Sequence, residues 1–160
     1  MLRIFGGFLI VCACTVTGFS AAAMYRLRLE QLEGFRALIA YIGAQIGVFL
    51  TPLDSIYAEF KNARLEACGF SELLRKHGGE AAINGCRRKL LLNDTEIGEA
   101  IKFFRGLGRH DAKEEERHCA YFEKRFDELC TSASAEMASK TRLCRTFGFL
   151  CGLMLAVILI

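Results

Sequence analysis

Both ends of this 160-residue chain are uncharged and apolar, while the middle carries nearly all of the charge. Residues 4–24 hold no ionisable side chain other than two cysteines, and residues 146–160 hold none other than one cysteine. Among the 21 Lys and Arg and the 18 Asp and Glu residues, only Arg3 lies outside Arg26–Arg145. We expect such a chain to place both ends in a bilayer and to hold one polar domain at the membrane surface.

The first apolar run predicts an N-terminal transmembrane anchor over residues 1–24. About 20 apolar residues cross a hydrocarbon core, and Ile4–Met24 is a run of 21 residues in which only Thr15, Thr17 and Ser20 are mildly polar interruptions. The alternative is a secretory signal peptide, because Arg3 would serve as its basic start and Ser20–Ala23 offers small residues for cleavage. We favour the uncleaved anchor, because the apolar run continues directly into a helical pattern.

The last apolar run predicts a shorter C-terminal membrane anchor over residues 146–160. As a helix this run is about 22 Å long, so the bilayer would thin there, or Arg142 and Arg145 would extend toward the headgroups. The alternative is an apolar helix buried in protein. Gly148 and Gly152 stand four residues apart, a spacing that lets membrane helices pack closely.

The basic residues that flank the two runs predict the orientation of the chain. Three arginines follow the first run and three basic residues precede the second, whereas only Arg3 and the amino terminus lie on the other side. The positive-inside rule therefore places residues 25–145 in the cytoplasm. This middle part is large enough to bury its own core. A net charge of +3 gives no reason to expect nucleic acid as a partner.

The middle of the chain is predicted to be all-α, an antiparallel bundle of about six helices whose first and last helices extend into the membrane anchors. Along residues 25–50, apolar residues recur at alternating intervals of three and four, which predicts one buried helix face. This seam consists of Leu32, Phe35, Ile39, Ile42, Ile46 and Phe49. A second seam, on a helix starting at Ala112, consists of Cys119, Phe122, Phe126, Leu129, Ala133 and Met137. We expect the two seams to face each other.

Shorter helices are expected between the two long ones. Thr51 is a good N-cap and Pro52 suits the first helical position, so a second helix is predicted from there to Cys68, where Gly69 stops it. The remaining predicted pieces are Ser71–His77 with Ser71 as its cap, then residues 80–92, the turn Asn93–Thr95 and a helix over residues 95–104.

The eight cysteines are interpreted as reduced packing residues in a reducing compartment. No Cys-x-x-Cys pair occurs, so the spacing favours neither a metal site nor a disulfide framework. Five of them stand in the middle of the chain, at positions where a small apolar side chain would serve: Cys68, Cys86, Cys119, Cys130 and Cys144.

Arg105–Asp111 is the most conspicuous loop, and it contains two glycines. Asp111 can cap the following helix, with Glu114 completing a capping box. Loops on rigid scaffolds often carry contacts, and the long helix that follows would hold this one far from the membrane. Solvated charges on a simple connector are the alternative. The candidate partner contacts are Arg105, Arg109, Asp111, Glu114 and Glu115.

No catalytic residue, metal or cofactor is expected. His110 beside Asp111 comes nearest to a catalytic pair, and a solvated turn explains it as well. Gly106-x-Gly108 lacks the preceding strand and the third glycine of a dinucleotide loop. The basic cluster Arg87–Lys89 would suit an acidic lipid or partner, or would be a solvated helix face.

In order and motif the chain resembles the stage III sporulation protein AB family of endospore-forming bacteria, over nearly its full length. The resemblance is carried by the N-terminal run with its glycines, Thr51-Pro52-Leu53, Leu107-Gly108, Asp111, the long last helix, and Leu143–Ile160 with Gly148 and Gly152. That family is similar in fold to the helical cytoplasmic domain of the platform protein of type II secretion and type IV pilus machines.

The resemblance implies a non-catalytic platform subunit in the mother-cell membrane, within the complex that joins mother cell and forespore. It also implies neighbouring membrane subunits and a secretion-type ATPase as partners, with no small-molecule substrate. Two features depart from the family: Glu114–Glu116 stands where a glutamine is common, and eight cysteines are many.

Two other functions stay open at this point. One is an exported helical binding protein, released by cleavage after residue 23 or lipid-anchored through Cys12 or Cys14. The other is a membrane enzyme that uses His110 and Asp111.

Overall fold

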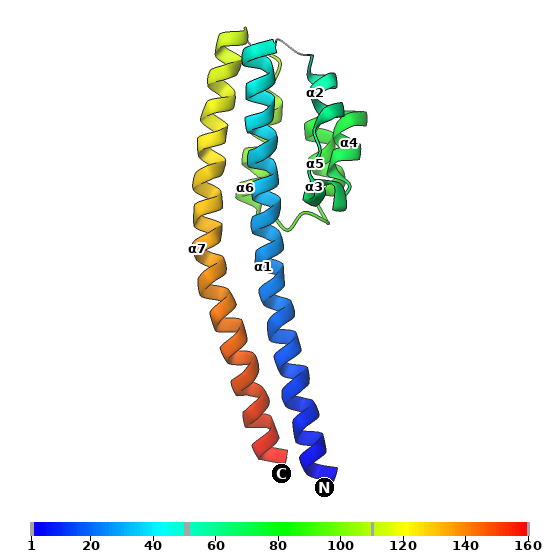
Figure 1. Cartoon of the computed structure of the whole chain (residues 1–160), viewed down its shortest axis with the longest axis vertical. Helices are drawn as coiled ribbons and strands as arrows, with labels where there is room; N and C mark the ends of the chain where they lie inside the picture. The colour runs from blue at the N-terminus through cyan, green and yellow to red at the C-terminus, as the bar shows by residue number, and fades with distance from the viewer. Residues whose placement is uncertain (1, 50–51, 110, 160) are drawn as a thin grey trace. The chain divides into compact units, whose positions relative to one another are not determined.

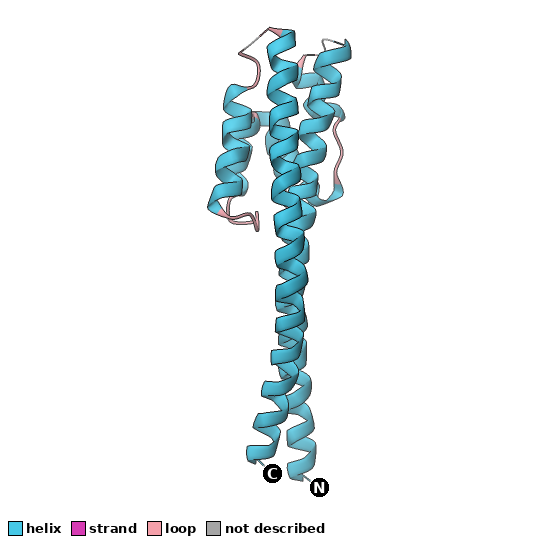
Figure 2. Ribbon diagram, turned by 90° about the vertical axis from the view of Figure 1, so that its left-hand side faces the viewer, coloured by secondary structure: helices cyan, strands magenta, loops and turns pink. Residues whose placement is uncertain are grey.

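The computed structural model describes the backbone of residues 2–49, 52–109 and 111–159. Side-chain surroundings are described over the same ranges except at residues 2–11, 14, 48–49, 145, 149, 152–153 and 155–159. The described elements are α1 (Leu2–Phe49), α2 (Leu53–Glu59), α3 (Ala63–Ala67), α4 (Phe70–His77), α5 (Gly79–Cys86), α6 (Asp94–Gly106) and α7 (Ala112–Leu159) (Figure 1). Within these ranges only helices and loops occur (Figure 2). The all-α class is confirmed, with seven described helices in place of about six.

The chain divides into two compact units. The terminal unit consists of Met1–Leu29 and Ser132–Ile160, and the central unit consists of Glu30–Thr131. The long helices α1 and α7 each contribute to both units, while all the shorter helices belong to the central unit. The predicted division into anchors of 1–24 and 146–160 around a domain of 25–145 stays a prediction.

The core of the central unit contains the predicted seams of α1 and α7. Phe35 and Phe126 are 1% and 0% exposed, and their ring centroids lie 6.2 Å apart. Leu129 is only half-buried, and the side chain of Phe49 lies outside the described residues. The facing of the two seams is therefore confirmed at Phe35 and Phe126. The other buried members in the central unit are Leu32, Ile39, Ile42, Ile46, Cys119 and Phe122. The seam of α7 continues into the terminal unit with the buried Ala133 and the half-buried Met137.

The short helices complete this core through aromatic contacts. Phe70 of α4 packs edge-on against Phe35 with ring centroids 4.9 Å apart. Phe103 of α6 is fully buried and meets Phe122 of α7 at 5.5 Å. Gly79 opens α5 against Phe104, where a Cβ atom would find no room. The five short helices therefore share one hydrophobic core with α1 and α7 of the central unit.

One helix predicted to run unbroken to Cys68 is two helices in the structure. α2 ends at Glu59. The side-chain oxygen of Asn62 caps α3 by accepting hydrogen bonds from the N–H groups of Arg64 and Leu65 at 3.1 and 3.2 Å. Arg75 donates to the carbonyl of Phe60 at 3.3 Å. The break is stable because side chains satisfy the backbone groups that it leaves open. The predicted stop at Gly69 is confirmed, since α3 ends just before it.

Two predicted helix starts need correction. Pro52 stands at the N-cap position, one residue before α2, and its carbonyl accepts from the N–H of Ser55 at 3.0 Å. The predicted cap Thr51 lies outside the described residues. Ser71 does not cap α4, because it is buried inside that helix. Gly69 makes this turn instead, with a φ of 80° that suits glycine.

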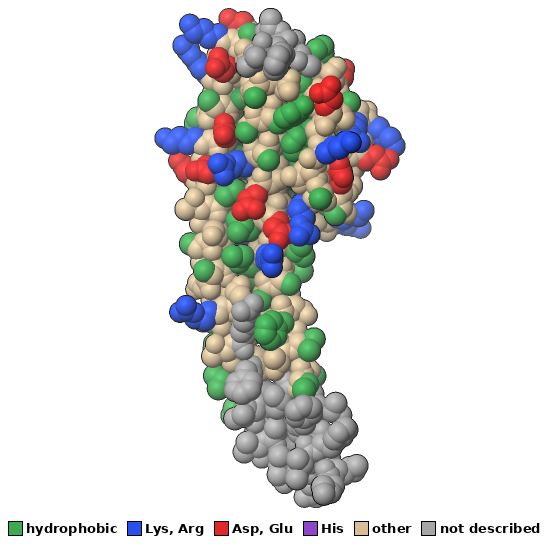
Figure 3. Space-filling model, viewed as in Figure 1, with side chains coloured by type: hydrophobic (Ala, Val, Ile, Leu, Met, Phe, Trp, Pro, Cys, Tyr) green, Lys and Arg blue, Asp and Glu red, His purple; other side chains and the backbone are tan. Residues whose placement is uncertain are grey.

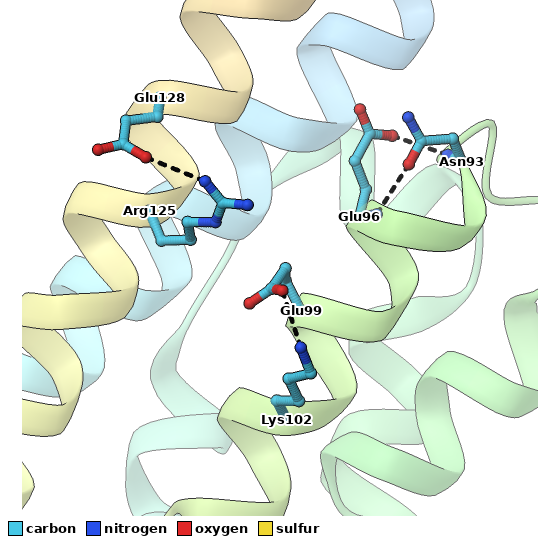
Figure 4. A network of polar contacts seen from close by, with 6 residues as sticks. All are labelled: Asn93, Glu96, Glu99, Lys102, Arg125 and Glu128. Atoms are coloured by element: carbon cyan, nitrogen blue, oxygen red, sulfur yellow. Dashed lines mark hydrogen bonds and ion pairs between the residues drawn. The ribbon is translucent and has the colours of Figure 1, made fainter.

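The helix predicted over residues 80–92 is shorter, because Gln31 of α1 holds the chain that follows. α5 ends at Cys86. The buried Gln31 amide accepts from the N–H of Leu91 at 2.8 Å and donates to the carbonyl of Lys89 at 3.3 Å. The predicted turn then ends in a capping box, in which Asn93 and Glu96 exchange hydrogen bonds of 2.7 and 2.8 Å (Figure 4).

Candidate functional site

The loop between α6 and α7 uses its two glycines for different reasons. At Gly106, the last residue of α6, a Cβ atom would lie 2.4 Å from the His118 ring. Gly108 has a φ of 78°, which favours glycine. Leu107 between them is buried. The sequence therefore determines the path of this loop from both ends.

Glu115 of α7 holds the backbone of the loop through a hydrogen bond. Its Oε1 atom accepts from the N–H of Gly108 at 2.8 Å, and the side chain is 3% exposed. This burial corrects the prediction that Glu115 contacts a partner, because its side chain does not reach the surface. A buried carboxylate needs a hydrogen-bond donor, and the backbone of the loop supplies one.

The two arginines of the loop act on one acidic residue. Arg105 of α6 forms an ion pair of 2.6 Å with Glu80 of α5, and both side chains stay exposed. The hydrogen bond from Arg105 lowers the pKa of Glu80, and the positive charge of Arg109 lowers it further. Both arginines therefore lie close enough to Glu80 to act on its charge.

The other two candidate contacts are on the surface at the start of α7. Asp111 and Glu114 are both exposed. The carbonyl of Asp111 accepts from the N–H of Glu115 at 2.9 Å, so the first turn of α7 is formed. Their side-chain capping box stays a prediction, and His110 lies outside the described residues. Within the described part of the chain, no cluster of His, Cys, Asp and Glu could hold a metal ion.

A packed interior lies beneath the loop, and of its residues described below only Cys119 was predicted from the sequence to be buried. The His118 ring stacks on Phe103 with centroids 5.5 Å apart, and one of its nitrogens lies 3.1 Å from the Phe103 carbonyl oxygen. Burial raises the pKa of Tyr57 to about 12, and the carboxylates of Asp54 and Glu115 add to the effect. Burial likewise raises the pKa of Cys119 to about 12. Both side chains therefore stay neutral at physiological pH.

Glycines bring α1 and α7 close together in the terminal unit. A Cβ atom on Gly18 would lie 2.7 Å from the carbonyl oxygen of Cys144 and 3.5 Å from the Cα atom of Gly148. Gly148 thus takes part in a close helix crossing. The surroundings of Gly152 lie outside the described residues. The sequence reading missed Gly18, although it is a small residue in the middle of an apolar run.

Exposed apolar side chains concentrate in the terminal unit. Of nine large apolar side chains that are exposed among the described residues, only Tyr121 belongs to the central unit. On the face shown in Figure 3, acidic and basic side chains instead gather over the part with the short helices. No helix within the described residues holds an apolar window long enough to cross a membrane. The eight exposed side chains of the terminal unit are Val16, Phe19, Met24, Leu27, Leu143, Phe147, Leu150 and Met154.

The described cysteines are free thiols. Four of them, Cys68, Cys86, Cys119 and Cys130, are buried in the central unit, as expected for packing residues. Cys12 and Cys151 of the terminal unit are exposed. Burial raises the pKa of Cys130 to about 11, so this thiol is poorly reactive at neutral pH.

Comparison with known proteins identifies the family. Residues 3–160 match the family model described as stage III sporulation protein AB, so the chain belongs to that family. It is 26% identical to stage III sporulation protein AB of Bacillus subtilis (strain 168) over 171 residues, which cover 99% of each chain. No solved structure matches the chain.

Proposed function

We propose that this member of the stage III sporulation protein AB family is a non-catalytic, membrane-anchored platform subunit of the complex that joins mother cell and forespore. Family membership points to a role in sporulation. The platform role rests on the resemblance to secretion-machine platform proteins. In this proposal the terminal unit is embedded in the mother-cell membrane, and the central unit scaffolds neighbouring subunits and docks an ATPase in the cytoplasm.

The observation that carries the membrane part is the exposed apolar surface of the terminal unit. Phe147 and Met154 are 59% and 67% exposed, and they lie in a run without charge. A soluble surface rarely leaves so many large apolar side chains in water, and their transfer to lipid is favourable. A bilayer is the covering that fits both the exposed side chains and the absence of charge in residues 4–24 and 146–160.

The helical course of α1 supports an uncleaved N-terminal anchor over the exported alternative. Ser20–Ala23, the small residues that a signal peptidase would need, lie within α1. The Ser20 hydroxyl donates to the carbonyl of Val16 at 2.9 Å, and Ala22 is buried. Cleavage needs an extended segment, so a packed helix at this position is a poor substrate.

Charges placed on the exposed apolar face test the membrane part. Phe19→Arg combined with Phe147→Arg and Met154→Arg places a charge on the exposed face of both apolar runs. This triple variant should be released from membranes washed with alkaline carbonate, because each arginine costs about 2.5–3.5 kcal/mol inside a bilayer. Tyr121→Arg is the matched control, since Tyr121 is 64% exposed but belongs to the central unit. Retention of the triple variant at the wild-type level would contradict the location of the terminal unit in the membrane.

Labelling of single cysteines tests the orientation. Cys68 and Cys86 are buried and would report accessibility poorly, whereas Asn84 is exposed on α5. A membrane-impermeant thiol reagent should label Asn84→Cys only after the cells are permeabilised. It should label Arg3→Cys in intact cells, because the positive-inside rule places that end outside. Labelling of Asn84→Cys in intact cells would favour the exported alternative.

The loop between α6 and α7 is our candidate for the ATPase contact. Arg105 and Arg109 are exposed, and the backbone that carries them is fixed by the contact of Gly108 with Glu115. Two exposed guanidinium groups on a fixed loop suit an acidic patch on a partner. Glu80, which pairs with Arg105, would be released from this arginine or would share it with the partner.

A pull-down tests the loop. Arg105→Ala combined with Arg109→Ala should leave the helix content and membrane insertion unchanged but should lower recovery of the ATPase. Arg88→Ala combined with Lys89→Ala is the matched control, since it removes two charges from the other exposed basic cluster. Equal recovery with both double variants, together with normal sporulation, would leave the loop as a connector.

A further inference from the structure

A groove of about 700 Å³ lies between α1 and α7 within the terminal unit. Phe19, Ala22 and Met137 give it apolar walls, and Thr141 lines it as well. Arg26 from α1 and Arg142 from α7 line the same groove. No acidic side chain is among its described lining residues. It is therefore an apolar groove with two cationic groups.

The two arginines stand where the charged part of the chain meets the apolar runs. Arg26 follows the uncharged residues 4–24, and Arg142 precedes the uncharged residues 146–160. Both side chains are exposed. The boundary of the apolar runs thus carries positive charge beside an apolar surface.

This chemistry matches an anionic phospholipid. A guanidinium presents a planar fork of donors that binds phosphate oxygens through two hydrogen bonds. The apolar walls would bury part of an acyl chain, which gains free energy with each methylene removed from water. A zwitterionic headgroup carries its own cationic group, which would be repelled by Arg26 and Arg142. An anionic headgroup therefore fits better.

We propose that this groove binds one anionic phospholipid, with its phosphate at Arg26 and Arg142 and an acyl chain along Phe19 and Met137. The inference deepens the proposed function and rests on it for the location of the terminal unit in a membrane. Such a lipid would hold α1 and α7 together at the level of the headgroups. It would also set the depth at which the two helices enter the bilayer.

Native mass spectrometry of the full chain, reconstituted in bilayer discs and released into detergent, tests the proposal. The discs contain equal amounts of phosphatidylglycerol and phosphatidylcholine. The wild type should retain one phosphatidylglycerol in preference to phosphatidylcholine. Arg26→Gln combined with Arg142→Gln should lower this retention at least about tenfold, the loss expected when charged hydrogen bonds are removed. The control, Lys113→Gln combined with Arg117→Gln, alters two exposed cations of the central unit and should retain the lipid.

A second variant keeps the test valid if the arginine variant folds poorly. Ala23 is exposed and lines the groove, so Ala23→Phe should fill it and displace the lipid while both arginines remain. Equal retention of phosphatidylglycerol by wild type and both groove variants, or equal retention of the two lipids by the wild type, would overturn the proposal. Failure of the wild type to enter the discs would instead contradict the proposed function.

Discussion

Truncation of Phe126 is the most direct test of the core of the central unit. Its side chain is 0% exposed and meets the Phe35 ring at a centroid distance of 6.2 Å. A buried phenylalanine removes about 150 Å² or more from water, which is worth about 4 kcal/mol at about 25 cal/mol per Å². Phe126→Ala should therefore lower the free energy of unfolding by about 3–5 kcal/mol.

Thermal unfolding of the full chain in detergent, followed by circular dichroism, measures this loss. For a chain of this size each kcal/mol shifts the melting temperature by about 2–4 °C, so Phe126→Ala should lower it by about 6–20 °C. Tyr121→Ala is the control, because this residue is aromatic, 64% exposed and on the same helix. Its effect should stay within about 0.5 kcal/mol.

A double-mutant cycle then isolates the contact between the two long helices. Phe35→Leu and Phe126→Leu each keep an apolar side chain but remove one ring of the pair. Their coupling energy should be about 0.5–1.5 kcal/mol, as for other aromatic pairs. A loss below about 1 kcal/mol for Phe126→Ala, equal to that of the control, would refute the assignment of Phe126 to the core.

Three further changes test other parts of the structure. Glu115→Ala should cost about 1.5 kcal/mol or more, since it removes the acceptor of the loop N–H. Glu116→Ala, at the exposed neighbouring position, should cost little, and chemical denaturation compares the two variants. Gly18→Leu should separate α1 from α7, because even a Cβ atom at this position would lie 2.7 Å from a backbone oxygen. Disulfide cross-linking between cysteines introduced on the two helices should then fail. Gly98→Ala is the control and should be tolerated, because the space around Gly98 is open. Burial raises the pKa of Cys119 from 9.0 to about 12, so its contribution to stability is present below pH 9 and is lost as the pH rises toward 12; Cys119→Ala should flatten the fall in unfolding free energy over that window.

The long helices and their buried face could be predicted from local pattern alone. Apolar residues at alternating intervals of three and four fall on one side of a helix, and Leu32, Phe35, Ile39 and Ile42 are indeed buried. Gly69 and Gly78 were also predictable as stops, because each adopts a positive φ that other residues avoid. These features depend on neighbours only a few residues away.

The ends of the short helices could not be predicted in the same way, because distant side chains determine them. α5 stops at Cys86, where the chain turns toward Gln31, a residue about sixty positions earlier that binds Lys89 and Leu91. Arg105 likewise finds its partner Glu80 on another helix, 25 residues away. A local pattern contains no information on such pairs. The sequence therefore predicted Arg105 as a surface residue of the loop but not the partner that orients it.

The burial of Glu115 could have been predicted from the helical spacing of the seam on α7. Three glutamates follow one another at 114–116, and successive residues of a helix point about 100° apart, so only one of them can face the core. Glu115 precedes Cys119 by four residues, and Cys119 precedes Phe122 by three, which continues the spacing of the buried seam. Burial of Glu115 follows from this register, and a buried carboxylate requires a donor nearby. The N–H of Gly108 is that donor. The hydrogen bond between Gly108 and Glu115 therefore both ends the buried seam of α7 and fixes the backbone of the loop.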